Sequence, residues 1–212
     1  GSGDSGGGAA SPSFWGVIWS HRVLDKMGAF VLHATLDHGL QAHTSHFLAL
    51  TAYFAPALFS QIRGPFKLAA GGMTLLTEHG DDIAAAHPSE IGEGLIHVLE
   101  FIAAVVADEP KECSSPAVVE YLVDMVVERE HSEAVMVQAL VVLYQLDMSH
   151  LEDHQLISLA SALVGRLRPK RKYSSEREKT HEDDEEESIS TLRLLERLLE
   201  REEGRRGVLM EG

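Results

Sequence analysis

The apolar residues between positions 14 and 168 recur at helical spacing. Ile91, Leu95, Val98 and Ile102 follow one another at steps of four, three and four, which places them on one face of a helix. Few stretches alternate with the period of two that marks a half-buried strand, and the chain has no Asn-Gly hairpin signal. Gly and Pro divide the region into helix-sized segments. The pattern predicts an all-α domain.

Capping residues and prolines predict where the helices begin. Pro56 is expected to break the helix that contains it, and Gly71-Gly72 is expected to punctuate the chain. Residues 115–168 are expected to form three helices joined by short loops, which makes neighbouring helices antiparallel. The predicted starts are Thr44 or Ser45, Pro65, Ser89, Ser115-Pro116, Ser132 and Asp153.

The second of these three helices carries a family resemblance. Ala139-Leu140 followed by Leu143 resembles the Ala-Leu-x-x-Leu core of the middle helix of an armadillo repeat, and residues 153–168 are similar to the third helix that packs beside it. HEAT-type helix pairs fit the pattern equally well. The resemblance implies an α-solenoid fragment of stacked antiparallel helical hairpins. The usual Asn of the middle helix is absent, with Gln145 nearby, so the Asn ladder that grips peptide backbones is not carried over.

The two ends of the chain differ from this domain in composition. Residues 1–13 are rich in Gly and Ser and predict a flexible segment, while residues 169–187 are almost devoid of apolar side chains and predict a disordered charged linker. An amphipathic helix over residues 188–203 and a tail over 204–212 follow. The helix either docks back on the domain, which we favour, or binds the groove of another protein.

Charge and cysteine content exclude several classes of protein. The chain has 18 Lys and Arg against 33 Asp and Glu, and residues 1–168 hold 8 basic and 20 acidic residues, a net charge of −12. The domain therefore lacks the basic patch that direct nucleic-acid binding needs. No apolar run approaches the roughly 20 residues of a membrane span. Cys113 is the one cysteine and lies in a predicted loop, which favours a surface thiol and a reducing, intracellular compartment.

A basic cluster follows the domain and resembles a monopartite nuclear localisation signal. The alternative is a solvated helix end with cations near the helix C-terminus. The location expected is therefore nuclear or cytoplasmic. Ser175 and Thr180 each precede an acidic residue by three positions, the pattern of an acidophilic kinase site. The residues assigned to the signal are Arg168, Lys170, Arg171 and Lys172.

Twelve histidines offer an alternative based on metal chemistry. Two groups stand out: His38, His43 and His46 fall within ten residues, and His150 and His154 are four apart. Such spacing is found in helical zinc sites, so a His-ligated zinc hydrolase or other metal-binding helical protein is the enzyme alternative. Surface or capping histidines are the simpler interpretation, because Asp153 as an N-cap would place His150 outside the helix.

Nucleotide-binding glycine loops and nucleophile elbows are missing from the sequence. We therefore assign no catalytic residue, no cofactor and no resident metal. The function expected is a non-catalytic protein-interaction scaffold, a fragment of a larger protein that presents a helical surface to a protein partner. A third possibility is an assembly module that docks a neighbouring domain or self-associates. The residues predicted to face a partner are Gln138, Tyr144, Gln145, Trp15 and Trp19.

Overall fold

The computed structural model describes residues 37–64, 67–86, 92–108, 110–128, 131–167, 181–201 and 208–209, together with positions 23 and 26. Every regular element in these ranges is a helix and none is a strand, so the all-α prediction is confirmed. No described helix is long and apolar enough to cross a bilayer. Several predicted residues lie outside the described ranges, and these are Trp15, Trp19, Pro65, Ser89, Arg168, Lys170, Arg171, Lys172, Ser175 and Thr180.

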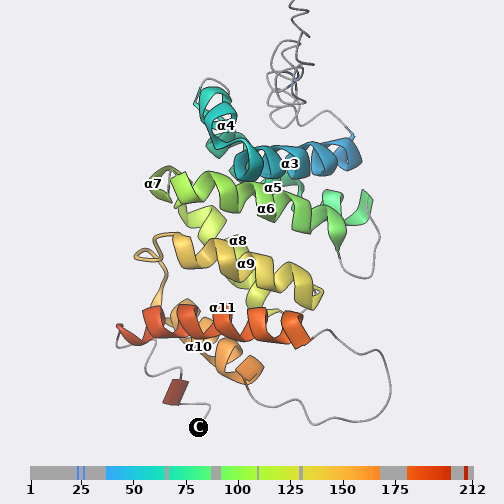
Figure 1. The fold of residues 1–212 in the computed structure, drawn as a ribbon. Helices are drawn as coiled ribbons and strands as arrows, with labels where there is room; N and C mark the ends of the chain where they lie inside the picture. The colour runs from blue at the N-terminus through green and yellow to red at the C-terminus, as the bar shows by residue number, and fades with distance from the viewer. Residues whose placement is uncertain are drawn as a thin grey trace, which may run out of the picture.

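The longer helices form two packed rows (Figure 1). In the first row α3 packs on α6, α6 on α9, and α9 on α11. In the second row α5 contacts α8 and α8 contacts α10, while α5, α8 and α10 pack against α6, α9 and α11 respectively. Their bounds are α3 (His38–Phe54), α5 (Leu68–Ala86), α6 (Glu93–Asp108), α8 (Pro116–Val127), α9 (Glu133–Gln145), α10 (Asp153–Leu167) and α11 (His181–Leu199). In chain order the short α4 (Pro56–Arg63) comes between α3 and α5, and the short α7 (Pro110–Cys113) comes between α6 and α8.

The partners of α10 differ from the sequence prediction. The prediction paired residues 153–168 with the helix before them, but α10 makes its main contacts with α8 and α11. The place beside α9 is taken by α11, whose Leu194 and Leu198 are fully buried. The connection between α9 and α10 is also apolar, because Leu146, Met148 and Leu151 are buried in it.

Three of the predicted helix boundaries are confirmed. The Ser115 side chain accepts a hydrogen bond from the amide of Val118, and Pro116 occupies the first turn of α8. The Ser132 side chain likewise accepts from the amide of Val135 at the start of α9. Pro56 separates α3 from α4, as predicted for a residue that cannot donate within a helix.

The predicted start at Thr44 or Ser45 is wrong. Asp37 caps α3 instead, since its Oδ1 accepts hydrogen bonds from the amides of Gly39 at 2.8 Å and Leu40 at 3.2 Å. An Asp with two free amides in reach is a strong N-cap, and neither Gly39 nor any residue up to Phe54 interrupts the helix after it. Thr44 and Ser45 are therefore buried inside α3.

Other local predictions are also corrected. Gly71-Gly72 lies inside α5, where the missing Cβ of Gly72 leaves room for the Phe101 ring of α6, whose Cε1 would lie 3.0 Å from that Cβ. Asp153 is the first residue of α10 rather than its cap. Cys113 ends the short helix α7 and is buried, where a surface thiol in a loop was expected. Its side chain belongs to the central core instead.

Gly92 occupies a backbone conformation that favours glycine. Its φ of +70° lies in the left-handed region, and an added Cβ would come within 2.6 Å of Val135 Cγ2. Glycine alone adopts this conformation without steric cost. Gly92 directly precedes α6, and its backbone lies against the first turn of α9 at Val135.

The last helix begins earlier than predicted. It starts at His181 rather than Ser188, so part of the stretch expected to be a disordered linker is helical. Residues 182–187, all acidic in the sequence, belong to this helix. The expectation that this helix docks back is confirmed, because Arg197 donates to the carbonyl of Tyr144 and Arg201 to that of Met148.

Tyr121 of α8 links α8 to α5 within the second row and makes the stability of the fold sensitive to alkaline pH. Its hydroxyl donates to Asp81 Oδ1 at 3.4 Å. Burial, followed by the negative charge of Asp81 and this hydrogen bond, raises the pKa of Tyr121 to about 12. Because the unfolded value is about 10, the neutral hydroxyl stabilises the fold fully below that pH, and the contribution is lost as the pH rises through 12.

We therefore expect wild-type protein to lose more unfolding free energy than Tyr121→Phe between about pH 9 and pH 11. Denaturant unfolding at the two pH values measures this difference, and the other tyrosines are common to both proteins. Equal losses in the two proteins would contradict the assigned pKa.

Candidate functional site

A groove of about 490 Å³ lies on the first row of helices. Its walls come from α3, α4 and α6, with one residue from α9. Small side chains keep it open, because alanines of α3 and α6 line it where the two helices face each other. The lining residues are His46, Ala49, Leu50, Ala52, Tyr53, Pro56, Phe59, Glu100, Ala103, Ala104, Ala107, Asp108 and Gln138.

One end of this groove exposes large apolar side chains. Tyr53 is 80% exposed, Phe54 64% and Leu50 38%. The rings of Tyr53 and Phe54 meet edge to face with centroids 4.8 Å apart. Large exposed aromatics next to an apolar hollow are typical of surfaces that bind another molecule.

The lining residues include two carboxylates, and each has a partner. Glu100 Oε2 lies 2.8 Å from Nδ1 of His46, which also lines the groove. Asp108 is paired with Arg63 of α4. Arg63 is not itself a lining residue, but both carboxylates of the groove already have a partner.

A cluster of histidines adjoins the groove between α3 and α6. His46 of α3 stacks on His97 of α6 with ring centroids 4.2 Å apart, and the His43 ring is 5.9 Å from that of His97. His97 is 9% exposed. Burial, and then the neighbouring His46, lower the pKa of His97, against the opposing charges of Glu100 and Glu93. The neutral imidazole, which is the form that binds metals, is therefore favoured at this position.

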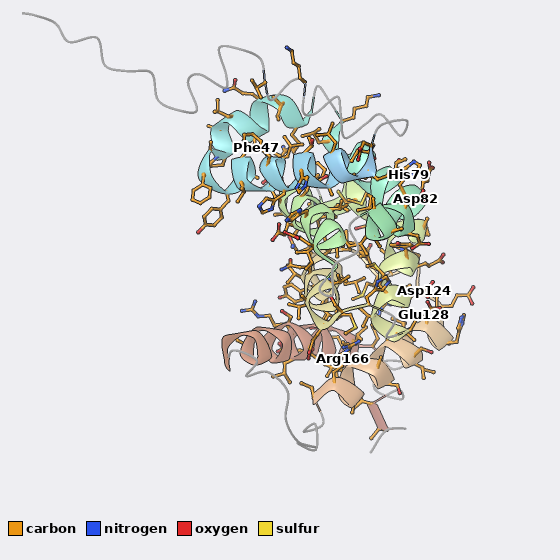
Figure 2. The ribbon with its side chains drawn as sticks, turned by 90° about the vertical axis from the view of Figure 1, so that its right-hand side faces the viewer. Phe47, His79, Asp82, Asp124, Glu128 and Arg166 are labelled. Atoms are coloured by element: carbon orange, nitrogen blue, oxygen red, sulfur yellow. The ribbon has the colours of Figure 1, made fainter. Side chains whose placement is uncertain are left out.

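A second cluster lies between the first turn of α3 and α5. Both His38 Nε2 and His79 Nδ1 are 3.7 Å from Asp82 Oδ2. Figure 2 labels His79 and Asp82 close together at the α5 side of the molecule. Asp82 is 64% exposed, and His38 Nδ1 already lies 2.9 Å from Gln41 Oε1. This cluster is therefore more open than the one beside the groove.

The structure separates the histidines that the sequence grouped. His38, His43 and His46 lie along one helix instead of being gathered by a turn, so His38 joins one cluster and His46 the other. His150 precedes α10, while the exposed His154 has its Nδ1 3.3 Å from Glu152, and neither belongs to a described metal-compatible group.

The partners that complete these clusters were missed in the sequence. His79 and Asp82, like His97 and Glu100, are three residues apart, which places each pair on one helix face. This spacing was the feature of the sequence that could have indicated the two pairs. It does not by itself indicate a cluster, because the histidines of α3 complete each cluster only through the packing of α3 against α5 and α6.

Gln138, Tyr144 and Gln145 were predicted to face a partner, and they have different surroundings. Gln138 lines the groove. Tyr144 and Gln145 lie beside α11 in a separate hollow with charged walls, and Gln145 donates its side-chain amide to the carbonyl of Val141. Trp15 and Trp19 are outside the described residues.

Comparison of the chain with protein-family models, curated proteins and solved structures found no match. The function is therefore argued from the groove and its neighbouring side chains.

Proposed function

We propose that this protein is a non-catalytic interaction scaffold, built as an armadillo- or HEAT-like stack of helices, that binds a protein partner along its first row. The groove beside Tyr53 and Phe54 carries this proposal, because it joins an apolar hollow to exposed aromatic side chains. The repeated contact of α3, α6 and α9 supports the stacked arrangement. Such rows leave a long face free for binding.

The groove and the charge of the chain favour a partner segment with apolar anchors and basic flanks. Alanine-lined walls accept side chains such as Leu or Phe. The net charge of −12 over residues 1–168 steers the same kind of partner toward the chain. An amphipathic helix with Lys or Arg beside its apolar stripe meets both conditions.

Binding of a defined peptide tests this proposal. We expect a labelled helical peptide with a Leu/Phe stripe and Lys/Arg flanks to bind more tightly than the same peptide with Glu flanks or with its residues scrambled. Fluorescence anisotropy at physiological salt measures the three affinities. Equal binding of all three peptides, or none, would contradict the proposal.

A matched pair of variants locates the binding. Ala107 is exposed and lines the groove, whereas Ala134 is exposed on α9 and outside the lining. Ala107→Gln partly fills the groove without adding charge, so we expect at least about tenfold weaker peptide binding, equal to about 1.4 kcal/mol. Ala134→Gln should bind as wild type does. If Ala107→Gln also binds unchanged, the peptide occupies another surface.

Self-association is the competing outcome for the same apolar surface. Native mass spectrometry of the free protein separates the two, because a scaffold awaiting a partner gives a monomer whereas an assembly module gives a dimer or larger species. A dimer that Ala107→Gln disrupts would replace the peptide proposal with assembly.

A further inference from the structure

We propose that His46, His97 and Glu100 bind a Zn²⁺ ion between α3 and α6, with His43 as the fourth ligand. The first three side chains each offer a ligand atom, and these atoms lie within 4.8 Å of one another. His46 and Glu100 also line the groove, but the proposal rests on the ligand atoms and their surroundings and does not require the groove to bind a peptide.

The register of the two helices supports a single ion. His43 and His46 are one turn apart on α3, and His97 and Glu100 are one turn apart on α6, so each helix directs a pair of donors from one face. α3 and α6 pack directly on each other. Two facing helices that each contribute a pair at this spacing are a common way to build a metal site inside a helical bundle.

The donors match zinc in type and nearly in position. Imidazole nitrogens and a carboxylate oxygen are ordinary zinc ligands at about 2.0–2.2 Å, which places tetrahedral ligand atoms about 3.3 Å from one another. His46 Nδ1 and Glu100 Oε2 are already 2.8 Å apart. Closing the remaining separations among the His46, His97 and Glu100 ligand atoms, which are at most 4.8 Å, requires side-chain adjustment rather than movement of the helices, and His43 reaches the ion by turning its side chain.

His97 supplies a second, independent observation. Its Nδ1 is buried and has no hydrogen-bond partner among the described residues, while its Nε2 lies 4.0 Å from Glu93 Oε1. A buried imidazole nitrogen without a partner is costly. If Nδ1 binds the metal, Nε2 carries the ring proton and can donate it to a carboxylate that fixes the orientation of the ring. Glu93 is placed to accept this hydrogen bond.

The cluster of His38, His79 and Asp82 is the natural comparison within the same chain. It has the same donor types, and its His79 Nε2 is likewise buried without a hydrogen-bond partner in the described part of the chain, but its carboxylate is more exposed and the other ring nitrogen of His38 already has a side-chain partner. We therefore assign the ion to the His46 cluster and use the His38 cluster as the control.

Zinc titration of metal-stripped full-length protein tests the assignment. We expect one equivalent of Zn²⁺ to bind per chain in competition with a chromophoric chelator. His97→Gln or Glu100→Gln should weaken binding by about 100-fold, because each of about four ligands carries a share of the affinity. His79→Gln should leave it unchanged. Co²⁺ in place of Zn²⁺ should give the visible bands of a four-coordinate ion in wild type and in His79→Gln only.

Circular dichroism of each variant shows whether it is folded. If His97→Gln does not fold, His46→Gln and Glu100→Gln decide the question, because their side chains are 37% and 33% exposed. Failure of wild type to bind one equivalent of zinc overturns the proposal. So does a result in which His79→Gln abolishes binding while the His46 and Glu100 variants retain it.

Discussion

Phe101→Ala lowers the free energy of unfolding by about 3–5 kcal/mol, the range for removal of a fully buried aromatic ring. Phe101 is 0% exposed and lies in the layer where α6 meets α5. Its ring reaches the space left by the missing side chain of Gly72. Two backbones held this close cannot collapse into the cavity that Ala leaves, so little of the lost packing is recovered.

Denaturant unfolding measures this effect, and Phe54→Ala is the matched control. Phe54 is 64% exposed at the end of α3, so its removal should change stability by no more than about 0.5 kcal/mol. A loss below about 1 kcal/mol for Phe101→Ala would contradict the packing of α6 on α5. That packing also sets the position of His97 and Glu100, which lie on the same helix.

Leu194→Asp releases α11 from the stack. Leu194 is 0% exposed where α11 packs on α9 and α10, and a carboxylate there loses its hydration. The lost apolar burial and the cost of burying a charge together destabilise the docked position of α11 by more than about 3 kcal/mol. An equilibrium shift of that size raises the population of undocked α11 by at least about 100-fold.

Limited trypsin digestion reports this change, because α11 carries Arg193 and Arg197 and Arg201 follows it. Cleavage at these sites should accelerate in proportion to the undocked population when docking is fast relative to cleavage. Leu192→Asp is the matched control, since Leu192 is 53% exposed on the same helix. Similar cleavage rates for the two variants would show that α11 is not held by its buried stripe.

The helical class could be predicted because it depends on local spacing. Leu95, Val98 and Ile102 recur at the helical period and are buried in α6. The caps at Ser115 and Ser132 were equally readable, since an N-cap acts within three residues of its own position. The start of α3 was missed because Asp37, Thr44 and Ser45 are all acceptable N-caps, and the sequence alone does not rank them.

The partners of each helix were less predictable, because they depend on contacts between distant segments. α10 has an apolar stripe that α8, α9 or α11 could cover equally well by sequence. In the structure α11 packs beside α9, and α10 packs against α8 and α11 instead. The same limitation applies to His97, which joins His46 across 51 positions only because α3 and α6 are adjacent.

Mapping the bound peptide onto the chain tests the central claim most directly. Isotope-labelled protein is titrated with the unlabelled basic-flanked peptide, and amide chemical shifts are followed by NMR. The groove account predicts that the largest changes fall on Ala49, Tyr53, Ala107 and Gln138, which join α3, α6 and α9 in one surface. Changes concentrated on α8 and α10, or no saturable change at all, would contradict it.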